Sequence, residues 1–193
     1  YHKRKNQLLM VRAVLELSKR YKFGVSFIGE ASSDLHQTQK HLVVNEIERL
    51  GLEKVIEIRD SVDFSEMNAL YEEHDIFVLP ATNEPASISV LEALGQGLPT
   101  ICSDTCGTKT YIQSGVNGFV FESDNLQSLV EKIEKFLVNP QLCEEMSKNA
   151  TDFAKENISS EAYYHHFMRM LNKHFGIQID NIEDMLSHKK DVF

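Results

Sequence analysis

The apolar positions of the chain alternate between two spacings. Short continuous apolar runs are separated by longer segments in which apolar residues recur every three or four positions, as on one face of a helix. We therefore predict strands at residues 24–29, 54–58, 75–80, 100–103 and 119–122. Helical segments are predicted at residues 8–21, 35–50, 64–73, 88–96, 109–113, 126–138, 140–156 and 160–175. This alternation is typical of an α/β fold, and we expect a Rossmann-like parallel sheet with helices on both faces and a C-terminal helical extension.

Composition limits the classes of protein that fit this pattern. With 193 residues and 42% apolar content, the chain is long enough for one globular domain, which we place at residues 1–175, followed by a weakly patterned tail at 176–193. The net charge of −9 argues against a nucleic-acid partner. A local basic cluster at Lys3, Arg4 and Lys5 remains suitable for holding a phosphate.

The cysteines and the apolar runs indicate the cellular compartment. Cys102, Cys106 and Cys143 are odd in number and lack a paired ligand pattern, which favours a reducing cytoplasm and gives no metal site. The sequence shows no signal peptide and no apolar run near the roughly 18 residues of a membrane span. We expect a cytoplasmic protein, with peripheral membrane association left open. The chain opens on Tyr1, not Met, and we expect a fragment of a larger protein.

Two glutamates eight positions apart carry the clearest chemical signal. Glu84 follows the strand predicted at 75–80, and Glu92 lies near the start of the next helix. In an open α/β sheet ligands bind at the carboxyl ends of the strands, and a helix start favours a diphosphate there. Carboxylates accept hydrogen bonds from neighbouring hydroxyls, so two acids flanking an anion site suit a sugar nucleotide. Such spacing also arises by chance in many helices.

The surrounding residues make the signal more specific. The segment NEPASISVLEALGQGLPTICSDTCGTKTYIQSGVNGF, residues 83–119, resembles family 4 of the nucleotide-sugar-dependent glycosyltransferases, in the C-terminal half of their two-domain GT-B fold. The resemblance covers about residues 5–137. It rests on Glu84 and Glu92 and on small and turn-forming residues at the family's positions, namely Pro85, Ala93, Gly97, Leu98, Pro99, Gly107, Gly115, Asn117 and Gly118. Gly107 and Gly118 are expected to be turn residues with positive φ.

The resemblance implies roles for individual residues. Glu84 would contact the hydroxyls of the donor sugar, Glu92 the ribose, and Lys5 the diphosphate, while the family's matching Arg would precede Tyr1. The expected catalytic residues are Glu84 and Lys5, and the expected donor-binding residues are Glu84, Ser87, Ile88, Ser89, Val90, Glu92 and Arg59. Two positions depart from the family, because Ala86-Ser87 replaces a frequent Phe-Gly pair and Thr110 replaces a frequent acid. These departures leave the donor sugar open.

Each of these residues also has an ordinary structural interpretation. Ser89 and Glu92 match a capping box, so Glu92 could serve only the helix start. Glu84 could be a solvated loop acid, Lys5 a solvated lysine at a helix start, and Arg59 a surface arginine. These alternatives stay open at the level of sequence.

The implied activity is that of a retaining, metal-independent glycosyltransferase. It would use a nucleotide-diphosphate sugar as co-substrate, without a cofactor, and a sugar, lipid-linked or protein acceptor. Acceptor binding would fall to an N-terminal GT-B domain, so the 193-residue chain is expected to be inactive alone. The family's sheet would also place a further strand between the strands at 24–29 and 75–80. The alternatives are an epimerase or phosphorylase of the same fold, or a non-catalytic nucleotide-binding or interaction module.

Overall fold

A computed structural model describes residues 1–175, apart from the side chain of Phe64. The chain divides into a compact unit, Tyr1–Ala154, and a second unit, Lys155–Phe193. The domain predicted at residues 1–175 thus includes part of the second unit, and the predicted tail at 176–193 lies outside the described residues. None of the described helices is long and apolar enough to cross a membrane.

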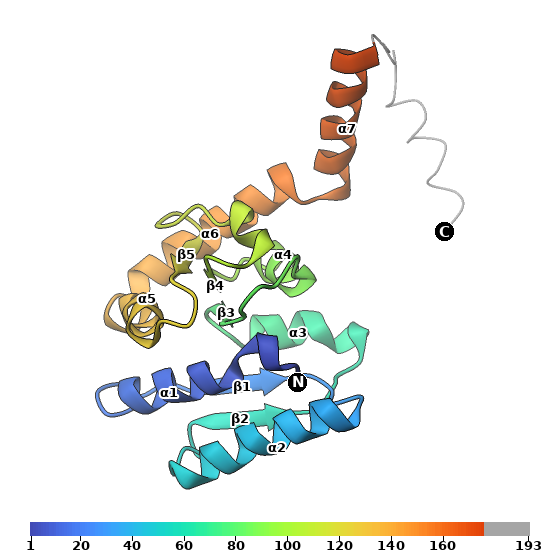
Figure 1. Cartoon of the computed structure of the whole chain (residues 1–193). Helices are drawn as coiled ribbons and strands as arrows, with labels where there is room; N and C mark the ends of the chain where they lie inside the picture. Colours follow the sequence, from blue (N-terminus) through green and yellow to red (C-terminus); the bar gives the residue numbers. More distant parts are fainter. Residues whose placement is uncertain (176–193) are drawn as a thin grey trace. The chain divides into compact units, whose positions relative to one another are not determined.

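Five short strands appear at the five predicted places, and every pairing between them is parallel (Figure 1). β1 (Val25–Ile28) pairs with β2 (Ile56–Arg59), with Val25 opposite Ile56. A second sheet has the order β3-β4-β5 and contains Phe77–Leu79, Thr100–Ser103 and Gly118–Phe121. The predicted parallel α/β architecture is therefore confirmed, but in residues 1–175 the strands form two sheets rather than one.

The break between the sheets falls at a defined place. β1 and β3 are the two strands between which the resemblance places a further strand, and within the described residues no ladder of hydrogen bonds joins them. Each therefore keeps one backbone edge outside its own sheet. The predicted strand order is not contradicted by this arrangement.

Seven α-helices accompany the strands in residues 1–175. They are α1 (Gln7–Leu17), α2 (Asp34–Arg49), α3 (Met67–Glu72), α4 (Ile88–Gly95), α5 (Leu126–Val138), α6 (Pro140–Asn157) and α7 (Ser160–Phe175). Some of these helices begin at a residue whose side chain accepts a backbone N–H. Ser33 caps α2 and Asn125 caps α5, each satisfying one N–H that the helix leaves free.

Two predicted helices differ from the structure. The segment predicted at 64–73 begins as a 3-10 turn, Phe64–Glu66, and becomes α-helical only at Met67. Asp63 and Glu66 have the spacing of a capping box, which predicts Asp63 as the N-cap, but the N-cap of α3 is Glu66 and its side chain makes no capping bond. The turn predicted at 109–113 is a 3-10 helix at Gly107–Tyr111. A capping pattern is local, and tertiary context can override it.

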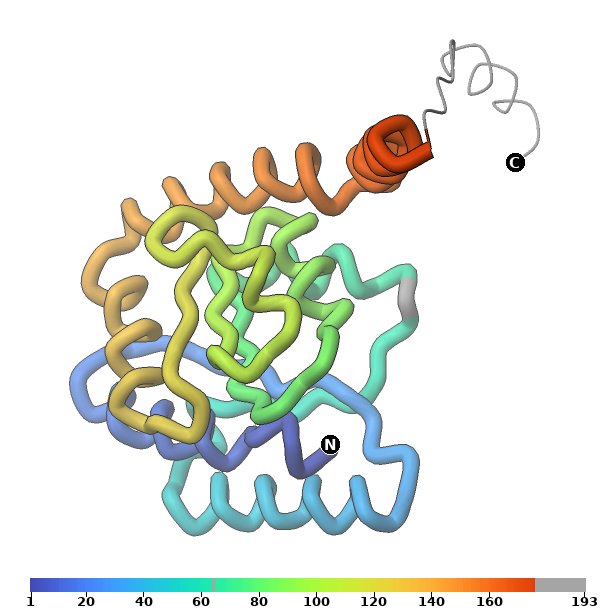
Figure 2. The backbone as a smooth tube through the Cα atoms, turned by 45° about the horizontal axis from the view of Figure 1, so that its top comes forward, coloured from blue at the N-terminus to red at the C-terminus, as the bar shows by residue number. Residues whose placement is uncertain are grey.

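The main core lies where α1 packs against α2 and α5 (Figure 2). Val11, Val14 and Leu17 of α1 are completely buried, with Ile101 of β4 and Leu129 of α5 in the same cluster. Each such side chain contributes about 1.5–3 kcal/mol relative to an exposed position. A smaller cluster lies on α3 and α4, and α4 packs on β3 and β4. Helices thus flank the sheets and hold the carboxyl ends of β3 and β4 in place.

Candidate functional site at the carboxyl end of β3

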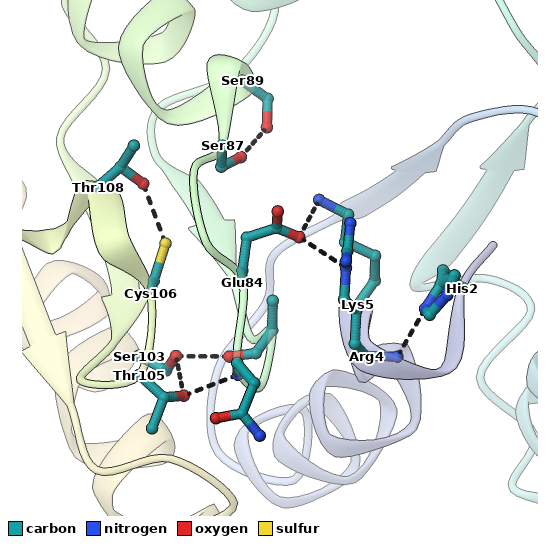
Figure 3. Close-up of polar contacts among 12 residues, drawn as sticks. His2, Arg4, Lys5, Glu84, Ser87, Ser89, Ser103, Thr105, Cys106 and Thr108 are labelled. Atoms are coloured by element: carbon teal, nitrogen blue, oxygen red, sulfur yellow. Dashed lines mark hydrogen bonds and ion pairs between the residues drawn. The ribbon is translucent and has the colours of Figure 1, made fainter.

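Glu84 lies just beyond β3 and is only 3% exposed. Its Oε2 is 2.8 Å from Lys5 Nζ and 3.2 Å from Arg4 Nε (Figure 3). Both contacts are ion pairs and not well-aligned hydrogen bonds. A buried carboxylate is costly unless it is paired, so the two cations account for its burial. The solvated-loop interpretation of Glu84 is therefore wrong.

A short turn brings the basic residues to the strand end. Lys3–Lys5 form a 3-10 helix, whose start is capped because the His2 imidazole accepts the Arg4 N–H at 3.2 Å. Asn6 ends the turn in the left-handed conformation, with φ of 54°. The Thr82 N–H donates to the Arg4 carbonyl at 2.7 Å, which ties the turn to the segment after β3. This backbone bond explains why residues 80 positions apart share one site.

The backbone of Glu84 is held by the loop after β4. The Gly107 N–H donates to the Glu84 carbonyl at 2.8 Å. A Cβ at Gly107 would overlap the Pro85 carbonyl, so this position requires glycine because of close approach. The expected positive φ is wrong for Gly107, which is not among the residues with that conformation. At Gly118, a Cβ would likewise overlap the backbone of Thr100 on the neighbouring strand.

Two cysteines lie close to Gly107, Cys102 on β4 and Cys106 on the loop that follows it. Cys106 is fully buried, and its Sγ lies 3.0 Å from the Thr108 hydroxyl oxygen. A hydrogen bond from the Cys102 thiol lowers the pKa of Cys106 to about 6, while the same bond and burial raise the pKa of Cys102. In the part of the chain that the structure describes, no three His, Cys, Asp or Glu side chains gather as they would around a metal ion.

Glu92 lies on α4 with its carboxylate held from the neighbouring helix. The Tyr71 hydroxyl donates to Glu92 Oε2 at 3.0 Å. The N-cap of α4 is Ser87, whose hydroxyl is 2.8 Å from that of Ser89 (Figure 3). The capping-box interpretation of Ser89 and Glu92 is therefore wrong, because Ser89 lies inside the helix. Glu92 thus has a different partner from the one that the motif suggested.

The other expected donor-binding residues have different exposures. Ile88, the first residue of α4, is 72% exposed, whereas the Val90 side chain is fully buried in the core. Val90 therefore offers a ligand no exposed side chain. Arg59 ends β2, and its guanidinium pairs with Glu57 and Glu73 at 3.0 Å each. The donor-binding role of Arg59 stays a prediction.

Three residues of this region were missed by sequence reasoning. The sequence placed Arg4 in a basic cluster suited to a phosphate but did not indicate its contact with Glu84. Tyr71 and Cys106 carried no local motif that points to the site. The basic cluster at the start of the chain was the available signal for Arg4, because clustered positive charge favours a buried carboxylate or a phosphate nearby.

Comparison with known proteins places these features in a family. The family model described as Glycosyl transferases group 1 matches residues 1–153. An uncharacterized glycosyltransferase of Haemophilus influenzae is 32% identical over 120 residues, which are 58% of this chain and 32% of that protein. The chain spans about a third or less of the length of the first curated relatives.

Solved structures have the same fold. The C-terminal domain of a glycosyl transferase group 1 family protein from Francisella tularensis superposes with a TM-score of 0.76 at 21% identity, covering 83% of both chains. An Anabaena protein solved in complex with UDP-glucose gives a TM-score of 0.77 at 20% identity, over 90% of this chain and 46% of that one. At these identities the likeness shows the fold.

Proposed function

The chain belongs to the family of glycosyl transferases group 1 and has the fold of the C-terminal domain of a GT-B enzyme, and from this premise we propose that it is the donor-binding half of a retaining glycosyltransferase. Its ligand would be a nucleotide-diphosphate sugar bound at the carboxyl end of β3. The UDP-glucose complex of the structurally similar Anabaena protein supports this class of ligand.

One observation carries the proposal. The buried Glu84 carboxylate holds Lys5 and Arg4 beside the segment that leads into α4. The first N–H groups of any α-helix lack intrahelical acceptors and lie at its positive end. Two cations and a helix start at one strand end form a site for a diphosphate. Carboxylates on either side of it can accept hydrogen bonds from hydroxyls of the ligand.

We assign separate roles to the acids and the bases. Glu92 would accept hydrogen bonds from the ribose, and Glu84 from the donor sugar. Lys5 and Arg4 would neutralise the diphosphate, together with backbone N–H groups at the start of α4. The Lys5 ammonium has three N–H donors, so it can hold Glu84 and a phosphate oxygen at once. Lys5 can therefore contact its observed partner, Glu84, and its expected partner, the diphosphate, at the same time.

The proposed reaction is front-face transfer. The bond between the anomeric carbon and the diphosphate oxygen breaks, and the acceptor oxygen forms a new bond to that carbon on the same face. The acceptor proton passes to the departing phosphate oxygen. The cationic side chains and helix-end amides stabilise the leaving group, which is the main electrostatic contribution to such a step. No cofactor and no metal ion enter this scheme.

The test is calorimetry on two single variants. A thermal-shift screen with UDP, GDP and ADP, free and as sugar conjugates, first identifies the ligand. Glu92→Ala should weaken the free nucleoside diphosphate about tenfold to a hundredfold, since a charged hydrogen bond is lost. Glu84→Ala should weaken the sugar conjugate but not the free diphosphate, because its removal leaves Lys5 and Arg4 to the phosphates.

A matched control is Glu145→Ala, an exposed acid of α6. It should leave both affinities unchanged. Equal losses for both ligands in Glu84→Ala and Glu92→Ala would contradict the assigned roles. Absence of binding by all three nucleotides would contradict the function itself.

We further propose that acceptor binding requires an N-terminal domain. The chain spans 32% of the Haemophilus influenzae relative, which leaves most of that protein for other tasks. Transfer needs an acceptor hydroxyl held near the donor carbon with water excluded. The 193-residue chain should therefore bind a nucleoside diphosphate but transfer no sugar. Acceptor-dependent release of nucleoside diphosphate by this chain, lost in Glu84→Ala, would contradict the two-domain proposal.

The acceptor itself is proposed only by class, as a sugar, a lipid-linked sugar or a protein. A cytoplasmic location is proposed because Cys102, Cys106 and Cys143 are all free thiols, as a reducing compartment would keep them. Peripheral association with a membrane would follow if the acceptor is lipid-linked. Cosedimentation with vesicles that carry such a lipid would test it.

A further inference from the structure

Tyr71 and Glu92 join two helices that are distant in sequence. Tyr71 lies on α3 and Glu92 on α4, and the Tyr71 hydroxyl donates to Glu92 Oε2 at 3.0 Å. Resting on the proposed function, we propose that Tyr71 is a positioning residue that fixes the Glu92 carboxylate for recognition of the nucleotide ribose. It would act through Glu92 and not touch the ligand.

Tyr71 is held firmly enough to position another side chain. The residue is 8% exposed and clusters with Ala93 and Leu98. Its ring meets Phe77 of β3 edge to face, with ring centroids 6.4 Å apart. A tyrosine has few rotatable bonds, whereas a free glutamate samples many rotamers. A hydroxyl fixed in the core therefore removes freedom from Glu92 before the ligand arrives, which lowers the ordering cost of binding.

The chemistry of the pair leaves room for a ligand. Burial raises the pKa of Tyr71, and the hydrogen bond to Glu92 raises it further, so the phenol stays protonated and donates. An ionised carboxylate has two oxygens and about four acceptor positions. The bond from Tyr71 occupies one position on Oε2. The remaining positions can accept from a pair of ribose hydroxyls.

A second hydrogen bond, besides that of the Tyr71 hydroxyl, links α3 to the end of α4. The Gln96 amide on the turn after α4 donates to Asn68 on α3 at 2.9 Å. Tyr71→Phe should keep the ring packing and this second link, and should remove only the hydroxyl. Asn68→Ala makes the opposite change, since it removes an interhelical bond that does not involve Glu92. The two variants separate positioning of the carboxylate from helix packing.

The experiment uses the full chain and calorimetry. The ligands are the best binder among UDP, GDP and ADP and its 2′,3′-dideoxy analogue, which lacks the ribose hydroxyls. Tyr71→Phe should weaken the parent diphosphate about three- to tenfold and leave the dideoxy analogue unchanged, because one hydrogen bond to a charged group is lost. In a Glu92→Gln background, the added Tyr71→Phe change should have little further effect, since residues acting as a unit are not additive.

Two controls complete the design. Asn68→Ala should leave the ratio of the two affinities unchanged. Tyr21→Phe removes a chemically equivalent bond, from the Tyr21 hydroxyl to Glu134 at 2.7 Å, and should also leave it unchanged.

The outcomes distinguish the inference from the function on which it rests. Equal weakening of both ligands by Tyr71→Phe, or full additivity with Glu92→Gln, would overturn the positioning role. No effect of Tyr71→Phe on the parent diphosphate, while Glu92→Gln weakens it, would do the same. If no nucleotide binds, or if Glu92→Gln changes nothing, the proposed function fails and the inference falls with it.

Discussion

The ion pairs around Glu84 allow a quantitative prediction about stability. The perturbations are Lys5→Met and Arg4→Met, singly and together, and the double change combined with Glu84→Gln. Methionine keeps much of the aliphatic stem of each side chain, so the charge is the main property removed. Because both cations contact the same oxygen, Oε2, each can partly replace the other. The two substitutions should therefore not be additive.

The magnitude follows from distance and exposure. At an effective dielectric constant of 20, the contacts of 2.8 Å and 3.2 Å correspond to about 6 and about 5 kcal/mol. Lys5 is 33% exposed and Arg4 44%, so solvent screening and the cost of desolvation offset most of this energy. Each single variant should lose about 1 kcal/mol of unfolding free energy. The double variant should lose about 3–5 kcal/mol, because it leaves a buried charge unpaired.

Urea unfolding at pH 7 measures these losses, with Arg49→Met as control. Arg49 pairs with Glu46 on the surface of α2, so its removal should change stability little. Adding Glu84→Gln to the double variant should restore most of the lost stability, since a neutral amide no longer needs the cations. The reasoning would be refuted if the double variant lost only the sum of the two small single losses of unfolding free energy. It would also be refuted if Glu84→Gln restored no stability to the double variant.

Three further predictions concern the loop, the thiols and the core. Gly107→Ala should destabilise the chain and weaken nucleotide binding, because its Cβ overlaps backbone, whereas Gly95→Ala on α4 meets no atom within 4 Å and should not destabilise in the same urea assay. The pKa of Cys106 is lowered from 9.0 to about 6 by the bond from Cys102, so its stabilising contribution should be full above pH 9 and lost as pH falls toward 6. The difference in stability between the native chain and Cys106→Ala should therefore grow from pH 6 to pH 9, and a flat difference would contradict the lowered pKa. Leu129→Ala should cost about 2–5 kcal/mol in urea unfolding because the side chain is fully buried, and a loss below 1 kcal/mol would place it outside the core.

Periodicity predicted the elements well where local pattern and burial agree. The strand at Thr100–Ser103 and the helix at Leu126–Val138 have the predicted bounds, because the strand is continuously buried and the helix has a strong apolar face. Prediction failed at residues 63–66, where Asp63 and Glu66 suggest a capping box that does not form. A cap contributes only about 1 kcal/mol, so tertiary packing can shift a helix start by several residues.

The site was predictable only as far as its residues share one segment. Glu84 and Glu92 lie on one strand-to-helix connection, so their spacing already implied a common location. Arg4 and Tyr71 reach the same region through contacts that span 80 and 21 residues of sequence. No local pattern encodes such contacts, because they depend on the backbone bond from Thr82 and on the packing of α3 against α4.

The placement of Glu84 between two cations bears on how a charged ligand would enter. One carboxylate and two cations leave a net charge of about +1 at the start of α4, which attracts a diphosphate without leaving two bare cations to repel each other. Because the carboxylate is buried, it holds the Lys5 and Arg4 side chains near their working positions before any ligand arrives, and less freedom is then lost on binding. Removing the charge of Glu84 should accordingly have two opposed effects on a free diphosphate: stronger attraction and poorer pre-organisation. Raising the salt concentration screens the first effect and not the second, so the affinity of Glu84→Gln for the diphosphate should fall more steeply with salt than that of the native chain.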